Sequence, residues 1–297
     1  MPQRVTAITV THNGGLVIGA LLDSLPSDIP LLVVDNASID DTLEIVSMKR
    51  PDASVLRNSI GLGYGSAANQ GLKNVTTEFA LLVNPDSLLN EDAIASLIEA
   101  ADEFPDAAML GPKHQTVNGQ TELSHDVDLW KRKRYGKRCG EPIPKGPICA
   151  DFLSGAVVLV RISAIRSIGF YDPEIFLYFE DDDICIRLRQ AGYSLVLVPK
   201  SVVVHLNSGS VRPSRSYYWE KFWHFAWSRI YIEGKYHGIT ARTILAIRLG
   251  FLFGCKAIAN AIVGRRHNCS RDMARFAGTI AALFGVRVAV KQLSKDS

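Results

Sequence analysis

Four consecutive acidic residues form the group in this sequence that is best suited to acid–base chemistry. They run from Glu180 to Asp183, between an aromatic stretch at 176–179 and an amphipathic pattern that continues to Arg189. Acids at the start of a helix complement its dipole and stabilise it by about 0.3–1 kcal/mol each. Two acids would meet that need, whereas four repel one another. We therefore interpret one of them as a general base that takes a proton from a hydroxyl group.

A second set of polar residues directly follows apolar runs that predict strands. Asp35 and Asn36 follow the run 31–34, where a carboxylate could accept hydrogen bonds from a nucleobase imide or a ribose hydroxyl. A helix cap followed by a turn would explain the same residues. The strand at 5–10 likewise ends in Thr11-His12-Asn13.

Two more positions could bind a metal ion. Asp86, in Asn84-Pro85-Asp86, follows the buried run 79–83 and could ligate a divalent cation that bridges a diphosphate. A type I turn with proline at its second position is the alternative. His205 ends the β-branched run 202–204, and it is either a metal ligand or a core residue.

A glycine-rich segment covers residues 58–71 and could bring backbone N–H groups close to a phosphate. It does not match the dinucleotide-binding fingerprint, because Ser66 stands where that fingerprint needs glycine or alanine, and because it follows the third strand. The sequence also lacks GxxxxGK[ST]. These observations disfavour a dehydrogenase and exclude a P-loop.

The elements that would position these residues alternate between strands and helices. Strands are predicted at 5–10, 31–34, 53–57 and 79–83, and helices at 16–25, 40–50, 65–73 and 90–103. This order is typical of βαβ units in a mostly parallel sheet. Ligands bind beyond the carboxyl ends of the strands in such sheets, which is where the polar residues lie.

The rest of the chain follows a different pattern. Residues 113–148 are polar, contain two basic runs, and predict a long loop or lid. Further strands are predicted at 155–162, 194–198 and 201–205, with a helix at 182–190 between them. After about residue 210 only long helical patterns remain. We expect a catalytic α/β domain over residues 1–210 and a basic, aromatic-rich helical extension over residues 211–297.

Charge divides the chain at the same point. The 297 residues carry a formal net charge of +3, but residues 1–210 hold 18 Lys+Arg and 26 Asp+Glu, and residues 211–297 hold 15 and 4. The two parts therefore carry −8 and +11.

Five widely spaced cysteines without a CxxC pair suggest neither a disulfide framework nor a zinc site. We find no signal-peptide core and expect no membrane-spanning helix, which predicts a cytoplasmic protein.

The order of these motifs resembles that of the family 2 inverting glycosyltransferases of the GT-A fold, in particular their rhamnosyltransferase-like bacterial members. The resemblance covers about residues 5–210. The segments that carry it are 10–13, 33–38, 58–71, 82–86, 151–156, 169–172, 176–189 and 202–205. It implies the GT-A α/β fold and the transfer of a sugar, with inversion, from a nucleotide-sugar donor to a hydroxyl of a saccharide or lipid-linked saccharide acceptor. The donor that we expect is dTDP-L-rhamnose or another dTDP- or UDP-sugar.

The resemblance also assigns roles to individual residues. The residues expected to bind the donor are Thr11, Asn13, Asp35, Asn36, Asn58, Asn84 and Asp86. Asp86 and His205 would hold Mg²⁺ or Mn²⁺, while Asn84 replaces the first aspartate of the family's DxD element and leaves fewer anionic ligands. The general base would be Asp181, with Glu180 as its nearest rival.

The C-terminal extension combines apolar helical patterns with basic residues, and its part from 217 to 236 is rich in aromatic residues. Such helices can lie on an anionic membrane surface, which would make the enzyme peripheral on the inner face of the cell membrane. An ordinary helical subdomain or a homodimer interface is the alternative. Nucleic acid is a poorer partner because no recognised binding motif is present. The competing functions are a sugar-nucleotide nucleotidyltransferase and a non-catalytic, membrane-bound sugar-nucleotide-binding protein.

Overall fold

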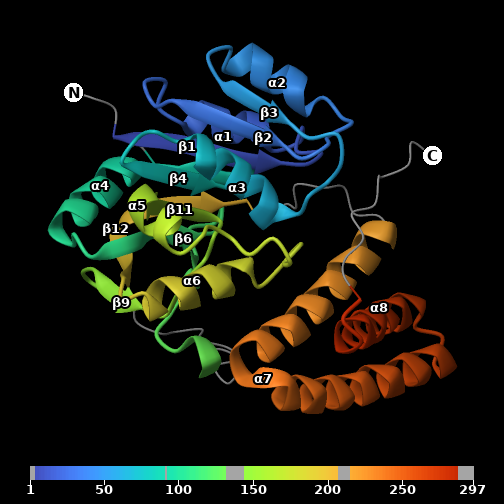
Figure 1. Cartoon of the computed structure of the whole chain (residues 1–297). Coiled ribbons are helices and arrows are strands. Elements are labelled where there is room, and N and C mark those ends of the chain that lie inside the picture. The colour runs from blue at the N-terminus through green and yellow to red at the C-terminus, as the bar shows by residue number, and fades with distance from the viewer. Residues whose placement is uncertain (1–3, 91, 132–143, 207–214, 287–297) are drawn as a thin grey trace.

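The computed structural model describes residues 4–90, 92–131, 144–206 and 215–286. Within these ranges a sheet flanked by helices forms the larger part, and two long helices lie beside it (Figure 1). The strands are β1 (Val5–Thr11), β2 (Leu31–Asp35), β3 (Ser54–Arg57), β4 (Phe79–Val83), β5 (Ser87–Leu89), β6 (Ala107–Gln115), β7 (Thr121–Glu122), β8 (His125–Asp126), β9 (Ile148–Ala150), β10 (Phe152–Leu153), β11 (Val157–Arg161) and β12 (Ser194–His205). The helices are α1 (Ile18–Ser24), α2 (Thr42–Lys49), α3 (Tyr64–Asn74), α4 (Ala93–Glu103), the short 3₁₀ turn η1 (Leu129–Lys131), α5 (Ile162–Ser167), α6 (Glu180–Gln190), α7 (Arg215–Ile262) and α8 (Arg266–Leu283).

The main sheet contains ten strands in the described ranges, with the central order β3-β2-β1-β4-β11-β6-β12-β5. Strands β3, β2, β1 and β4 pair in parallel with one another, and β6 pairs in parallel with β12. Strand β11 runs antiparallel to β4 and β6, and β5 runs antiparallel to β12. Strands β1, β2 and β4 are nearly fully buried, which explains their continuous apolar sequences. This mixed, mostly parallel sheet with a helical C-terminal region confirms the predicted fold class.

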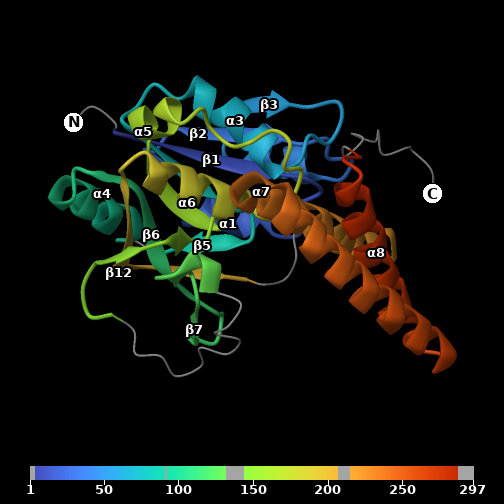
Figure 2. The same ribbon diagram turned by 60° about the horizontal axis from the view of Figure 1, so that its bottom comes forward.

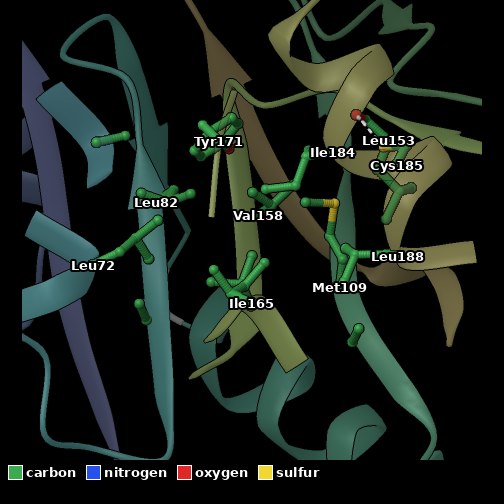
Figure 3. Close-up of a cluster of buried hydrophobic side chains, with 14 of the residues drawn as sticks. Leu72, Leu82, Met109, Leu153, Val158, Ile165, Tyr171, Ile184, Cys185 and Leu188 are labelled. Carbon is green, nitrogen blue, oxygen red and sulfur yellow. Dashed lines mark hydrogen bonds between the residues drawn. The ribbon is translucent and has the colours of Figure 1, made fainter. Parts of the chain in front are cut away.

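Helices cover both faces of the sheet. One buried cluster contains Leu72 of α3, Ile165 of α5 and Ile184 of α6, together with Leu82 and Val158 from the sheet (Figure 3). A second cluster, on the opposite face, is formed with side chains of α1, α2 and α4. Burial of apolar area contributes about 25 cal/mol per Å² and stabilises this three-layer arrangement. The packed layers hold in place the edge of the sheet at the carboxyl ends of its parallel strands, where the polar residues lie.

Three predicted elements differ from the structure. Residues 113–148 are not one loop, because β6 extends to Gln115, and three short strands and one 3₁₀ turn follow outside the undescribed residues 132–143. The two strands expected at 194–198 and 201–205 form the single strand β12, with a register irregularity between Val198 and Val202. Helix α6 begins at Glu180 rather than at 182, so all four acids lie in its first turn.

Helices α7 and α8 pack against each other beside the sheet (Figure 2). Gly238 has a φ of 84°, which interrupts α7 and divides it into a part before and a part after this residue. Length and composition alone would allow the helix Ser216–Ile262 to cross a membrane, since one 18-residue window carries no more than two charged residues. One such helix is weak evidence for a membrane span, so the expectation of no membrane-spanning helix stays a prediction.

Candidate active site

The carboxyl ends of β1 and β2 bring the first predicted donor-binding residues together. Thr11 lies opposite Asp35 in the parallel register. The N–H of Asn36 donates to the carbonyl of Thr11 at 2.8 Å, and the N–H of Asn58 donates to the carbonyl of Asp35 at 2.8 Å. The strand pattern predicts Thr11, Asp35 and Asn36 at one edge of the sheet, because parallel strands end on the same side, and the family resemblance adds Asn58.

Asp35 and Thr11 present buried polar atoms at this edge. The Asp35 side chain is fully buried, accepts the N–H of Ser38 at 3.2 Å, and has Arg57 Nε at 3.8 Å. Thr11 Oγ1 is buried and has no hydrogen-bond partner among the described residues. Asn13 adopts a left-handed conformation (φ 52°), and its Oδ1 accepts the N–H of Ile39 at 2.8 Å. An unpartnered buried hydroxyl beside a buried carboxylate suits a polar ligand group.

Asn36 and Asn58 hold the glycine-rich loop in place. Asn36 Oδ1 accepts the N–H of Leu62 at 2.9 Å. The amide of Asn58 forms two reciprocal hydrogen bonds with the amide of Gln70, both of 2.9 Å. Both side chains therefore shape the loop that leads into α3, and their contact with a donor remains a prediction.

The same loop touches the segment that carries the acids. Gly63 has a φ of 80°, and a Cβ at this position would lie 2.2 Å from the carbonyl oxygen of Phe176. The next residue, Tyr64, donates its N–H to that carbonyl at 3.0 Å. Only glycine permits this backbone approach, which connects the predicted donor pocket to the turn before α6.

The two predicted metal ligands lie next to each other. Strand β5 pairs with β12 so that His205 is opposite Ser87, the neighbour of Asp86. His205 Nε2 lies 3.5 Å from Asp86 Oδ1, a buried oxygen without a hydrogen-bond partner in the described structure. On the other side of the ring, Glu122 Oε2 lies 3.4 Å from Nδ1. The carboxylate of Asp86 raises the pKa of His205, against the effect of burial.

This pair has the chemistry of a small cation site. A carboxylate oxygen and an imidazole nitrogen suit Mn²⁺ or Mg²⁺. Adjacent ligands of one such ion are about 3 Å apart for bonds of 2.0–2.1 Å, close to the observed 3.5 Å between Asp86 and His205. Within the described ranges no group of three or more His, Cys, Asp or Glu could hold a metal ion. The protein would thus supply two ligands and leave the other positions to a donor diphosphate and water.

Asp181 lies close to the Asp86 turn because β4 and β11 pair. The N–H of Gly155 donates to Asp181 Oδ2 at 2.9 Å. The N–H of Asn84 donates to the carbonyl of Ala156, the residue after Gly155, at 2.8 Å. Two consecutive residues before β11 therefore connect the predicted metal turn with the predicted base.

Glu180 differs from Asp181 in its surroundings. Its side chain is buried, and Oε2 has no hydrogen-bond partner among the described residues. Burial, followed by the charge of Asp181, raises the pKa of Glu180 well above its ordinary value. Glu180 and Asp181 thus differ in burial and in hydrogen bonding, and the choice of Asp181 as the base remains a prediction.

The segment before α6 is held in a strained conformation. Tyr178 and Phe179 both have left-handed backbones, with φ of 66° and 68°. Each such residue costs about 1–3 kcal/mol and persists only where surrounding contacts enforce it. The ring of Phe225 from α7 packs on both, with centroid distances of 5.7 and 5.1 Å.

Sequence reasoning missed four residues of this region. Glu122 and His114 lie in the segment predicted as a loop, and His114, near the end of β6, has its ring 6.3 Å from that of His205. Burial, then the charge of His205, lowers the pKa of His114 to about 4. Gly155 donates its N–H to Asp181, and Lys235 Nζ lies 2.6 Å from Asp183 Oδ1. Gly155 lies in segment 151–156, which carries the family resemblance but was given no role, whereas the other three belong to no recognisable local pattern. Only the pairing of distant segments reveals them.

A mixed α/β sheet with polar residues at its carboxyl edge, a glycine-rich loop and an acidic helix start is the arrangement that the GT-A resemblance predicts. The sequence model of glycosyl transferase family 2 matches residues 6–155, and that of glycosyl transferase family group 2 matches residues 81–264. The chain belongs to glycosyltransferase family 2, and it is a glycosyltransferase.

Within the family the chain is similar to rhamnosyltransferases. It is 33% identical over 253 residues to the rhamnosyltransferase WbbL of Escherichia coli, covering 78% of this chain and 93% of that protein. It is 28% identical over 238 residues to the N-acetylglucosaminyl-diphospho-decaprenol L-rhamnosyltransferase of Mycobacterium tuberculosis, covering 69% and 76%. These relatives confirm the rhamnosyltransferase-like resemblance.

Solved structures confirm the GT-A fold. The mannosyltransferase PcManGT from Pyrobaculum calidifontis, in complex with GDP-Man and Mn²⁺, superposes with a TM-score of 0.56 at 17% identity over 95% of this chain and 87% of that one. S. aureus TarS 1–349 in complex with UDP-GlcNAc gives a TM-score of 0.52 at 16% identity, covering 95% and 92%.

Proposed function

We propose that the protein transfers L-rhamnose from dTDP-L-rhamnose, or the sugar of another dTDP- or UDP-sugar, to a hydroxyl of a saccharide or lipid-linked saccharide, with inversion, in cell-surface polysaccharide synthesis. The names of both rhamnosyltransferase relatives support the sugar, and the decaprenol-linked substrate of one supports the acceptor class. One observation carries the mechanism. The N–H of Gly155 donates to Asp181, and the carbonyl of the next residue, Ala156, accepts the N–H of Asn84, which links the predicted base to the turn that carries Asp86.

In the proposed reaction Asp181 removes the proton of the acceptor hydroxyl as the oxygen attacks the anomeric carbon opposite the leaving nucleoside diphosphate. General base catalysis of this kind contributes about 10²–10⁴-fold. The Gly155 N–H donates to Asp181 Oδ2 at 2.9 Å and so orients the carboxylate. The attack and the departure occur on opposite faces of the sugar, so inversion follows without a covalent intermediate.

Asp86 and His205 would hold Mg²⁺ or Mn²⁺, and Glu122 would keep the His205 ring oriented through Nδ1. The cation supplies Lewis-acid neutralisation of the charge that develops on the leaving diphosphate. Thr11, Asn13 and Asp35 would bind the base and ribose of the donor. The Mn²⁺ in the PcManGT complex and in the GalNAc-T7 complex supports this proposal.

A panel of sugar nucleotides with a lipid-linked or synthetic acceptor and Mn²⁺ tests the proposed reaction. We expect transfer from dTDP-L-rhamnose with release of dTDP and an inverted anomeric configuration in the product by NMR. Binding of donors without transfer or hydrolysis would indicate a binding protein. Release of pyrophosphate from dTTP and a sugar 1-phosphate would indicate a nucleotidyltransferase.

We further propose that the second part of α7 lies on an anionic membrane surface on the cytoplasmic side. Five of its apolar side chains are more than 60% exposed and recur every three, four or seven residues, along the helix face that α8 does not cover: Ile244, Ile247, Phe251, Ile258 and Ile262. Residues 234–271 contain no acid, while Arg248 and Lys256 lie within the stripe's length. Such a stripe with basic neighbours suits the interface of an anionic bilayer.

Flotation with vesicles tests this attachment. We expect the protein to float with vesicles rich in phosphatidylglycerol, and Phe251→Glu combined with Ile258→Glu to abolish flotation. Met48→Glu, at an exposed apolar residue of α2, is the matched control and should leave flotation unchanged. Equal flotation of both variants would contradict the proposal, and a concentration-dependent dimer lost only in the α7 variant would assign the stripe to a second copy instead.

A further inference from the structure

The part of α7 before Gly238 packs against the segment that carries the acids. We call residues 172–183 the catalytic segment, because it ends on the first turn of α6. His224 stacks on Phe176, with ring centroids 4.6 Å apart, and Ser228 Oγ donates to the carbonyl of Leu177 at 2.8 Å. These α7 residues are four positions apart, and Tyr231 and Lys235 continue the same face of the helix with spacings of three and four. One stripe of α7 therefore follows the catalytic segment along its length.

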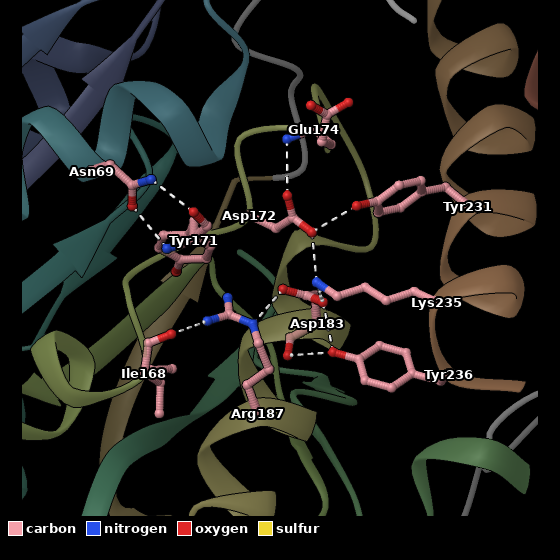
Figure 4. Close-up of polar contacts among 10 residues, drawn as sticks. All are labelled: Asn69, Ile168, Tyr171, Asp172, Glu174, Asp183, Arg187, Tyr231, Lys235 and Tyr236. Carbon is pink, nitrogen blue, oxygen red and sulfur yellow. Dashed lines mark hydrogen bonds and ion pairs between the residues drawn. The ribbon is translucent and has the colours of Figure 1, made fainter. Parts of the chain in front are cut away.

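Lys235 binds both ends of this segment. Its Nζ lies 2.5 Å from Asp172 Oδ2 and 2.6 Å from Asp183 Oδ1 (Figure 4). Tyr231 OH donates to Asp172 Oδ2 at 2.9 Å, and Tyr236 OH donates to Asp183 Oδ1 at 2.6 Å. The catalytic segment thus contacts the same ammonium at Asp172 and at Asp183, and its residues between them, including the strained Tyr178 and Phe179, also pack on α7.

The charges explain why this contact matters. Asp183 is fully buried, and its second oxygen accepts Arg187 Nε at 2.7 Å. Burial raises the pKa of Asp172, but the hydrogen bond from Lys235 and further hydrogen bonds lower it overall. Two carboxylates and two cations therefore balance. Without the ammonium of Lys235, Asp183 would keep Arg187 as its cation, whereas Asp172 would keep only the hydrogen bonds from Tyr231 and the N–H of Glu174.

We propose that Lys235 is a positioning residue for the catalytic base: it clamps Asp172 and Asp183 so that the strained turn between them holds Asp181 against Gly155. The proposal rests on the proposed function for its kinetic test. It assigns the part of α7 before Gly238 to the machinery of transfer, whereas the part after Gly238 carries the exposed stripe. Lys235 acts through the backbone of the segment and does not contact the reacting atoms.

The test compares Lys235→Met, Lys235→Arg and the control Lys221→Met in the full chain. Lys221 lies in the same part of α7, and no hydrogen bond or ion pair of its side chain occurs in the described structure. We expect Lys235→Met to lower kcat at least tenfold while the dissociation constant of the donor, measured by calorimetry, changes less than twofold. Lys235→Arg should recover a substantial part of kcat, because a guanidinium can also bridge two carboxylates. Lys221→Met should match the wild type.

A kcat of Lys235→Met within twofold of the wild type would overturn the proposal, as would a loss of donor binding that parallels the loss of kcat. If Lys235→Met does not fold, Tyr236→Phe removes one hydrogen bond to the same carboxylate. It should lower kcat about threefold with donor binding intact, and an unchanged kcat would overturn the proposal.

Hydrogen exchange separates this proposal from the proposed function. Peptides covering residues 172–190 should exchange faster in Lys235→Met than in Lys221→Met, whether or not the assay conditions support transfer. A wild-type protein without transfer activity would refute the proposed reaction alone. Unchanged exchange in this segment would refute the clamp.

Discussion

Gly155 offers a direct test of the base assignment, because an added methyl group would meet the Asp181 carboxylate. A Cβ on Gly155 would lie 2.1 Å from Asp181 Oδ1 and 2.7 Å from its Cγ, whereas ordinary contact begins at 3.4 Å. The backbone of Gly155 has no positive φ, so alanine is compatible with its conformation. In Gly155→Ala the carboxylate must therefore move while the backbone can remain in place.

The size of the effect follows from these distances. The Asp181 oxygen must move by about 1.3 Å to reach ordinary contact. A displacement of about 1 Å at a reacting group can cost about 100-fold in rate, which corresponds to about 2.7 kcal/mol. The free energy of unfolding should change by no more than about 1 kcal/mol. The lost hydrogen bond from the Gly155 N–H to Asp181 destabilises the folded protein, but alanine lowers the conformational entropy of the unfolded chain and offsets this loss.

Steady-state kinetics with donor and acceptor, together with urea unfolding, measure both effects. We expect kcat of Gly155→Ala to fall about 100-fold, with the donor dissociation constant and the urea midpoint near those of the wild type. Gly146→Ala is the matched control, because no atom lies within 4 Å of its added Cβ. If Gly155→Ala kept a kcat within threefold of the wild type, Asp181 would not be the base in the observed geometry.

Four further outcomes are expected. Asp181→Asn should lower kcat by about 10²–10⁴-fold and retain donor binding by calorimetry. Asp86→Ala should weaken Mn²⁺ binding, measured by electron paramagnetic resonance, at least tenfold, because it leaves His205 as the one protein ligand in the proposed site. Gly63→Ala should lower the free energy of unfolding by more than 2 kcal/mol, about the sum of a forced positive φ and a backbone clash. His224→Phe should remove part of the pH dependence of stability, because burial lowers the pKa of His224 to about 4.

The sign of that pH dependence follows from linkage. As the pH falls below about 6.5, the unfolded chain protonates His224 while the folded protein does not until about pH 4. Stability is therefore lost with falling pH, and the loss between pH 6.5 and pH 5 is about 2 kcal/mol. Urea unfolding of the wild type and His224→Phe at both pH values measures it, and an identical loss in the two proteins would contradict the assignment.

The other three variants have clear contrary outcomes. Wild-type turnover by Asp181→Asn would exclude this residue as the base. An unchanged Mn²⁺ affinity of Asp86→Ala would place the metal elsewhere. An unchanged free energy of unfolding of Gly63→Ala would show that the close contact of the loop with the Phe176 carbonyl does not contribute to stability.

The sequence was sufficient to predict strands β1 to β4 and the polar residues that follow them, whereas the central strand β6 and the short strand β5 were not predicted. Strands such as β1 and β4 are buried on both faces, so their apolar runs stand out between helices. Because parallel strands all end at one edge, the residues after them, including Asp35 and Asp86, could be placed together without a structure. Segments with weak periodicity, such as residues 113–148, were predicted poorly, since two-residue strands carry almost no pattern.

The contacts of the acids could not be predicted in the same way. The sequence predicted that the acids lie near the start of a helix and that Asp86 follows a strand, because both depend on neighbours in the chain. Only the tertiary structure decided that Gly155 holds Asp181, that Glu122 reaches His205, and that Lys235 joins the catalytic segment from a helix about 50 residues later. Such pairings depend on burial and charge balance between distant segments, which local sequence patterns do not record.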